Sequence, residues 1–313
     1  MGAWLLRRVA LIGPTLLLVS LLIFAMQQLL PGDPALALAG ENQDPAVIAH
    51  IRQTYHLDRP IPVRYVLWLE GVLHGDLGQS IRIQRPVADL IAEKLPVTAE
   101  LAGLALLVAL AIGVPAGVIA AVKQGSVIDH SVTLAALCGL SVPNFWLGML
   151  LILLFSVELG ILPASGYVSP GESITRNLTT LIMPAIVLGT AFAAGIMRHT
   201  RSAMLQVLSA DYIRLARAKG LGEARVVLRH ALHNALIPVV TVVALNFGAL
   251  LSGAVLTEQV FTIPGFGKLL VDAVFNRDYA VVQGVAMCSA LAYLLLNLGA
   301  DIAYLALNPR LRP

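Results

Sequence analysis

Charge is scarce in this sequence. Only 12% of its 313 residues are Asp, Glu, Lys or Arg, and 58% are hydrophobic, whereas about a quarter of residues are charged in soluble domains. A chain this apolar is expected to have lipid as its main solvent. The net charge of +3 comes without any dense basic tract, which argues against nucleic-acid binding.

Residues that would support catalysis or metal binding are also few. The two cysteines, Cys138 and Cys288, lie in apolar stretches without the spacing of a metal or redox site, so we expect both to be inert. His230 and His233 are three residues apart, but no Cys or carboxylate accompanies them as a ligand set would require. We predict no metal site and no catalytic residue, and an intramembrane enzyme lacks a Ser/His or paired-Asp constellation.

A phosphate-binding loop of the form Gly-x-x-x-x-Gly-Lys-Ser/Thr is missing as well. The nearest match is Gly267-Lys268, which is followed by Leu269 and has Thr262 in the place of the first glycine. This chain is therefore not expected to hydrolyse ATP itself.

Long apolar runs, by contrast, are abundant. Six are long enough to cross about 30 Å of hydrocarbon, and together they predict an all-α polytopic membrane protein with both termini on one side. The run after Arg7 and Arg8 is longer than the apolar part of a signal peptide, so we expect it to be retained. The predicted spans are residues 9–30, 99–122, 131–157, 180–197, 237–257 and 281–306.

The distribution of charge between the spans predicts the orientation. If the N-terminus is inside, the inner segments hold 12 Lys and Arg against 4 Asp and Glu, a net charge of +8. The outer segments hold nine against fourteen, a net charge of −5. Positive loops stay in the cytoplasm, so we expect the termini and residues 123–130 and 198–236 to be cytoplasmic. Residues 31–98 then form a Pro-rich outer loop, which we expect to be an ordered cap.

The segment between the fourth and fifth spans is the most informative. Gly220-Leu221-Gly222 should break a helix, and a second helix should follow with an apolar face. This pattern predicts a helix, an elbow and another helix, although a helix resting on lipid headgroups has a similar composition. The expected apolar face consists of Ala224, Val227, Leu228, Ala231, Leu232 and Ala235.

Two stretches of this segment, Asp211 to Gly220 and Arg229 to Pro238, resemble the coupling segment of ABC importer permeases. The similarity is greatest to the dipeptide, oligopeptide and nickel branch of that family. It extends along the chain in further motifs, which are Leu30-Pro31-Gly32-Asp33-Pro34, Gly75-Asp76-Leu77-Gly78, Ser141-Val142-Pro143, Phe261-Thr262-Ile263-Pro264-Gly265-Phe266-Gly267 and Asn308-Pro309-Arg310. Where the general pattern has Glu-Ala-Ala, this chain has Arg214-Leu215-Ala216.

The resemblance implies a type I ABC importer permease fold in a bacterial plasma (inner) membrane. The implied partners are a second homologous permease, two ATP-binding subunits that bind and hydrolyse the ATP, and an extracytoplasmic substrate-binding protein that docks on residues 31–98 and 264–278. It also implies an elbow that docks into a groove of an ATP-binding subunit, with Leu221 filling that groove. The implied coupling residues are Arg214, Ala216, Arg217, Ala218, Lys219, Gly220, Leu221, Gly222 and Arg225.

The cargo implied by the resemblance is a di- or oligopeptide, with glutathione and nickel chelates as alternatives. A secondary carrier is the alternative from another class, but deep intramembrane charges, which such a carrier would need, are nearly absent. Asn246 and Ser252 in the fifth span are candidates to line the translocation path. Small residues in the same span, such as Gly248, equally favour close helix packing.

Overall fold

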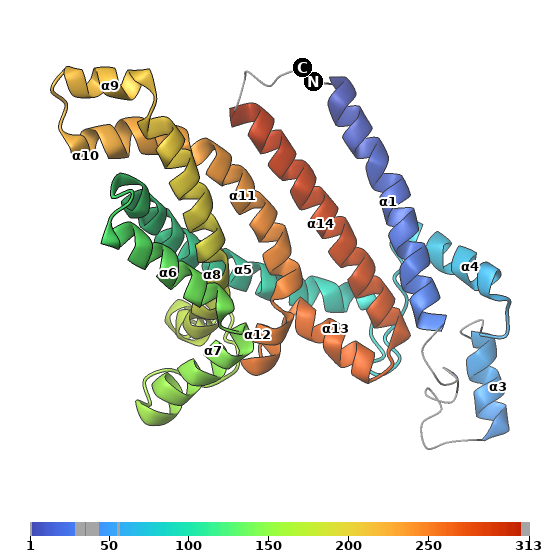
Figure 1. Ribbon diagram of the computed structural model, residues 1–313. Helices are drawn as coiled ribbons and strands as arrows, with labels where there is room; N and C mark the ends of the chain where they lie inside the picture. The colour runs from blue at the N-terminus through green and yellow to red at the C-terminus, as the bar shows by residue number, and fades with distance from the viewer. Residues whose placement is uncertain (1, 29–34, 36–43, 55–56, 308–313) are drawn as a thin grey trace. The chain divides into compact units, whose positions relative to one another are not determined.

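The computed structural model describes residues 2–28, 35, 44–54 and 57–307 (Figure 1). The motifs at residues 30–34 and 308–310 lie outside the described residues. The regular secondary structure of the described residues is helical, with one isolated bridge between Gln79 and Pro86. Its helices are α1 (Gly2–Gln28), α3 (Pro45–Thr54), α4 (Ile61–Leu73), α5 (Val87–Val122), α6 (Val127–Ser141), α7 (Asn144–Leu151), the π-helix η1 (Ile152–Glu158), α8 (Ile174–Leu208), α9 (Asp211–Ala218), α10 (Glu223–Arg225), the π-helix η2 (Val226–Ala231), α11 (Leu232–Gly253), α12 (Val255–Val260), α13 (Phe266–Phe275) and α14 (Tyr279–Leu307).

Five described helices are long and apolar enough to cross a membrane, and a bent pair of helices raises the number to six. The bent pair, Val127–Gly139 and Asn144–Glu158, covers the range 131–157 that the apolar run predicts as one span. The chain turns by 93° between α6 and the helix formed by α7 and η1. Val142 and Pro143 have extended backbones at this break, because a proline disfavours helical geometry in the residue before it and cannot donate a backbone hydrogen bond.

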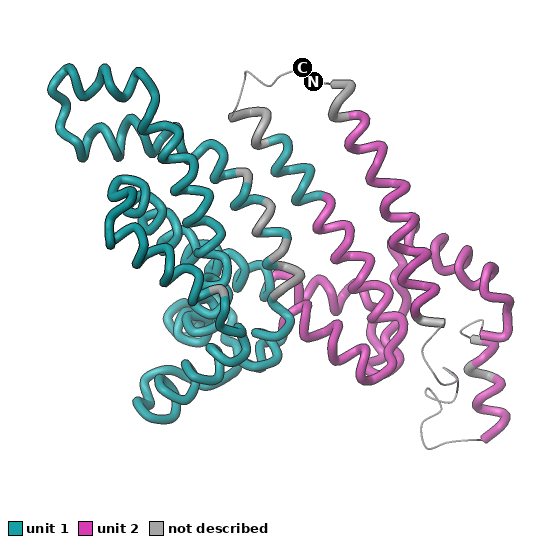
Figure 2. Tube along the Cα trace, in the orientation of Figure 1, with its two compact units in different colours: residues 1, 97–264, 295–313 teal, residues 2–96, 265–294 magenta. Residues whose placement is uncertain are grey.

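The chain forms two compact units, shown in teal and magenta in Figure 2. Unit 1 contains Val97–Pro264 together with the last part of α14. Its largest core cluster joins α5, α7, α8, α11 and α12 around fully buried side chains such as Leu101, Leu188 and Phe261. The carboxylate of Glu258 is also fully buried in this unit. It accepts a 2.5 Å hydrogen bond from the Thr98 hydroxyl.

Glycines allow α5 and α8 of unit 1 to pack closely. A Cβ atom at Gly113 would lie 2.6 Å from the carbonyl oxygen of Ala193, and one at Gly117 would lie 2.6 Å from Cβ of Thr200. On the α8 side, a Cβ at Gly189 would lie 2.7 Å from the carbonyl oxygen of Ala105. Small residues at helix contacts are typical of membrane proteins, where close packing replaces the hydrophobic effect as the main stabilising term between helices.

Unit 2 contains Gly2–Pro96 and Gly265–Leu294. Its core cluster packs the start of α5 against α13 and the start of α14, with Val87, Phe266 and Val285 among the buried side chains. Asp278 precedes α14 and accepts a 2.5 Å hydrogen bond from the hydroxyl of Ser80, a residue nearly 200 positions earlier. Unit 2 therefore brings together parts of the two segments that the sequence analysis predicts to be extracytoplasmic, residues 31–98 and 264–278.

Candidate functional site

The predicted coupling segment, residues 198–236, is helical over most of its length. α8 continues beyond the predicted span as far as Leu208, α9 follows, and α10 with η2 leads the chain back into α11. Figure 1 shows α9 and α10 side by side beyond the ends of α8 and α11, and α9 contacts η2. The segment thus has the helix, elbow and helix that its glycines and periodicity predict.

The elbow depends on one glycine more than on the other. Gly220 has a φ of +77°, in the left-handed region that costs a residue with a Cβ about 1–2 kcal/mol. Its N–H donates to the carbonyl of Arg217 at 2.9 Å, and the N–H of Leu221 donates to that of Ala216 at 3.4 Å. Gly222 precedes α10 with a φ of −61°, which any residue adopts. Gly220 is therefore the residue that permits the turn.

The inner face of the segment forms a small core of its own. Ile213 and Ala216 of α9 pack with Val226 and Val227 of η2 and with Met204 of α8, and all five are buried. Leu221 is half-buried and packs against the same cluster. Two of the predicted coupling residues, Ala216 and Leu221, therefore stabilise the elbow from within, and the structure does not show Leu221 as an exposed apolar tip.

The other predicted coupling residues are exposed on α9, in the elbow and on α10, and α9 exposes two further residues that the prediction omits. The apolar side chain of Leu215 is 56% exposed, and the aromatic side chain of Tyr212 is 45% exposed. Ile213 is buried, and a residue two positions later in a helix points to another face, so Leu215 is exposed. The spacing of apolar residues in the eight residues of α9 could therefore have identified Leu215 as an outward-facing residue. The predicted coupling residues that are exposed are Arg214, Arg217, Ala218, Lys219, Gly220, Gly222 and Arg225.

An ion pair spans the elbow. The Arg217 guanidinium donates two hydrogen bonds to the Glu223 carboxylate, at 3.1 and 2.7 Å. This carboxylate raises the pKa of Arg217 above its ordinary value. Both side chains are about half exposed, and pairs in such positions contribute little to stability. Its two hydrogen bonds connect the last turn of α9 to the first residue of α10 across the elbow.

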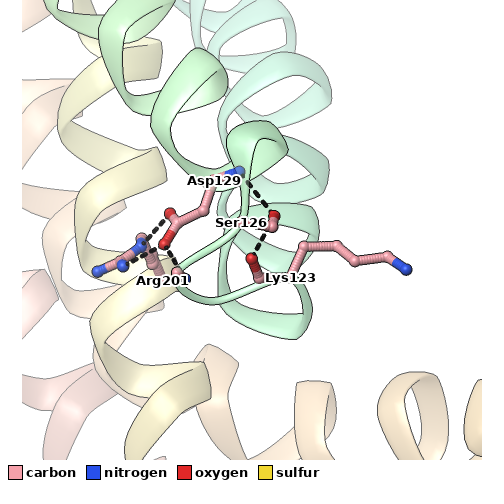
Figure 3. A network of polar contacts seen from close by, with 5 residues as sticks. Lys123, Ser126, Asp129 and Arg201 are labelled. Atoms are coloured by element: carbon pink, nitrogen blue, oxygen red, sulfur yellow. Dashed lines mark hydrogen bonds and ion pairs between the residues drawn. The ribbon is translucent and has the colours of Figure 1, made fainter.

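A second ion pair connects the base of the segment to α6 (Figure 3). Asp129 is buried in the first turn of α6 and accepts hydrogen bonds from Nε and Nη2 of Arg201 on α8, at 2.8 and 2.7 Å. The same carboxylate accepts a 3.0 Å bond from the N–H of Gly125, and the Asp129 N–H donates to the Ser126 hydroxyl, which caps α6. The network therefore holds the 123–129 turn to α8, close to the point where α8 leads into α9.

Asp129→Asn is expected to loosen this connection, because an amide provides one acceptor oxygen where the carboxylate provides two and leaves the Arg201 guanidinium without its counter-charge. We expect a lower thermal midpoint of unfolding for the purified protein. Arg201→Gln should lower it by a similar amount, and the double variant should lose little more than either single variant. Fully additive losses would mean that the two side chains act independently.

The two candidates for the translocation path, Asn246 and Ser252, belong to the backbone of α11. Their side chains lie outside the described residues. That they line a path therefore stays a prediction.

The N-terminal and C-terminal parts of the chain each match a family model. Residues 113–313 match the binding-protein-dependent transport system inner membrane component. Residues 1–102 match the N-terminal part of the membrane components of such systems.

Relatives and solved structures agree with these matches. The chain is 44% identical to the dipeptide transport system permease protein DppB of Escherichia coli K12, over 99% of this chain and 98% of the relative. It is 45% identical to the di/tripeptide transport system permease protein DppB of Pseudomonas aeruginosa UCBPP-PA14, over 98% and 97%. An inward-facing structure of the MetNI methionine ABC transporter superposes on 70% of this chain and 96% of its own, with a TM-score of 0.59 at 18% identity, and so shares the fold. This chain belongs to the family of inner membrane components of binding-protein-dependent transport systems.

Proposed function

We propose that this chain is the permease subunit of an ABC importer that carries di- and oligopeptides into the cell. The similarity to permeases named for dipeptide and di/tripeptide transport, across nearly the whole length of both chains, supports this cargo. Its role is translocation and not catalysis. Its partners are a second homologous permease, two ATP-binding subunits and an extracytoplasmic binding protein, and ATP is bound and hydrolysed by the partners.

The observation that carries the proposed mechanism is the two-faced construction of the coupling segment. On its inner face, Ile213 and Ala216 of α9 pack with Met204 of α8 and Val227 of η2. On its outer face, Leu215 and Tyr212 are exposed among charged side chains. An exposed apolar residue with a basic rim is what a groove on a partner subunit would bind. Movement of an ATP-binding subunit would then be transmitted through the elbow to α8 and α11.

The proposed orientation follows from the charge distribution. The coupling segment, the 123–130 turn and both termini face the cytoplasm, in accord with the excess of Lys and Arg in these segments. The described parts of unit 2 that come from residues 44–54, 57–96 and 265–278 then face outward, where a binding protein delivers the cargo.

Deleting the gene is expected to abolish uptake of labelled di- and tripeptides and to leave uptake of labelled nickel and glutathione unchanged. Complementation with the intact gene should restore peptide uptake. A variant that is expressed and inserted but cannot couple to the ATPase should not restore it. Unchanged peptide uptake together with lost nickel or glutathione uptake would reject the peptide cargo.

A further inference from the structure

α4 has the properties of a helix that lies in the surface of a membrane. Its 13 residues span about 20 Å at 1.5 Å per residue, which is too short to cross a hydrocarbon core of about 30 Å. Arg64 and Glu70 are its only charged residues, and none of its side chains is fully buried within the described protein. Such a helix in an aqueous loop would expose an unusual amount of apolar surface.

The contacts between α4 and α1 show at which level along α1 the helix α4 lies. The Ser20 hydroxyl and the Tyr65 hydroxyl are 2.8 Å apart, and the Phe24 ring lies edge-on to Tyr65 at 5.4 Å and tilted to Trp68 at 6.0 Å. Ser20 and Phe24 are buried by these contacts. Both belong to the last two turns of the apolar stretch Leu6–Met26, which is a candidate span.

The contacts therefore hold α4 at the end of a membrane span. At 1.5 Å per residue, Ser20 and Phe24 lie only about 3–9 Å from the end of the apolar stretch at Met26. This is the depth at which the acyl chains meet the headgroups, where Tyr and Trp side chains such as Tyr65 and Trp68 are enriched.

The exposed side of α4 is apolar along one stripe. Pro62, Val66, Leu69 and Leu73 follow each other at i, i+4, i+7 and i+11, the spacing of a single helical face. Val66 is 60% exposed, Leu73 is 79% exposed and Leu69 is half-buried. The exposed Glu70 borders the stripe, four residues after Val66 and three before Leu73, while Arg64 lies on another face. The face of α1 away from α4 is also apolar and exposed, with Leu18 at 58% and Leu22 at 53%.

We propose that α4 is an interfacial anchor that inserts this stripe into the acyl chains of the leaflet at the C-terminal end of α1. Lipid is the occupant because α4 is held beside a lipid-facing span, at the depth of the interface, by an aromatic cluster. The anchor fixes the outer part of unit 2 at the membrane surface. It does not depend on the identity of the cargo.

Site-specific fluorescence in vesicles tests this assignment. In the full chain with Cys138→Ser and Cys288→Ser, single cysteines at Val66→Cys and Leu73→Cys are labelled with bimane and reconstituted in phosphatidylethanolamine and phosphatidylglycerol. Asp58→Cys, at an exposed position in the turn before α4, serves as the matched control. Each labelled protein is used only if it elutes as the unlabelled chain does.

When acyl-chain-brominated phosphatidylcholine is mixed into these vesicles, it is expected to quench the labels at residues 66 and 73 several-fold more strongly than the label at residue 58. Aqueous iodide should show the reverse order. Iodide quenching at all three positions would place α4 in water and overturn the proposal. Protection of residues 66 and 73 from both quenchers would show that a protein partner covers the stripe, which would overturn it equally.

Discussion

Leu215→Asp is expected to abolish transport while the protein still folds and inserts. Leu215 is 56% exposed on the outer face of α9, so a carboxylate there remains in water in the isolated chain. In the proposed contact with an ATP-binding subunit, the same carboxylate would be buried without a partner. Loss of a central apolar contact costs about 2–4 kcal/mol at an interface, which corresponds to a roughly 30- to 700-fold weaker complex.

The measurements are peptide uptake and the stimulation of ATPase activity by loaded binding protein, both in the assembled complex. Leu215→Met keeps an apolar side chain of similar volume and should retain both activities. Leu221→Asp is a poorer test, because Leu221 packs against the internal cluster and its loss would also destabilise the elbow. Wild-type uptake with Leu215→Asp would exclude the outer face of α9 as the docking surface.

Gly113→Leu is expected to prevent α5 and α8 from packing, and folded protein should no longer be recovered. Even a Cβ at this position would lie 2.6 Å from a backbone oxygen of Ala193 and 2.9 Å from Cβ of Ile196. Backbone cannot move aside as a flexible side chain does, so the helices would have to separate. Gly113→Ala should therefore destabilise the protein by at least the 1–3 kcal/mol or so that is typical of overpacking.

Gly103→Ala provides the control on the same helix, because a Cβ at this position would meet no atom of a neighbouring element within 4 Å. Alanine is the better helix former, so this variant should be as stable as the unaltered protein or slightly more stable. Thermal unfolding in detergent, followed by size-exclusion chromatography, distinguishes the variants. Equal midpoints for Gly113→Ala and Gly103→Ala would show that α5 and α8 do not need this close approach.

The sequence predicts the helical class well, because length and hydropathy report directly on membrane crossing. Its count of six spans agrees with the described helices if the bent pair is taken as one span. It does not predict the 93° turn near Pro143. The residues around this proline are mostly apolar, and hydropathy carries no information about the direction of a helix. The available signal was Pro143 with the polar Ser141 and Asn144 around it, which together interrupt the apolar run.

In the coupling segment, too, the sequence predicts the features that depend on a few neighbouring residues and does not predict those that depend on packing between helices. The break at Gly220 follows from glycine chemistry within a few residues. The inward position of Leu221 depends on how α9 packs against α8 and η2, which no local pattern contains. The pairing of Asp129 with Arg201 joins residues 72 positions apart, and the Ser126-x-x-Asp129 cap predicts where α6 begins but not which cation the carboxylate meets.

The proline within α8, Pro184, affects how α8 can bend when the coupling segment moves. Pro184 has no N–H to donate to the carbonyl of Thr180, so α8 is least stiff at that point. Between Pro184 and Leu208 the helix is an unbroken rod about 36 Å long, tied to α6 near its C-terminal end by the ion pair between Arg201 and Asp129. A tilt of this rod by roughly 6° about the proline would displace its far end by about 4 Å. Pro184 would thus act as a hinge in α8, and the elbow follows the longer of the two parts of the helix, the one from Pro184 to Leu208.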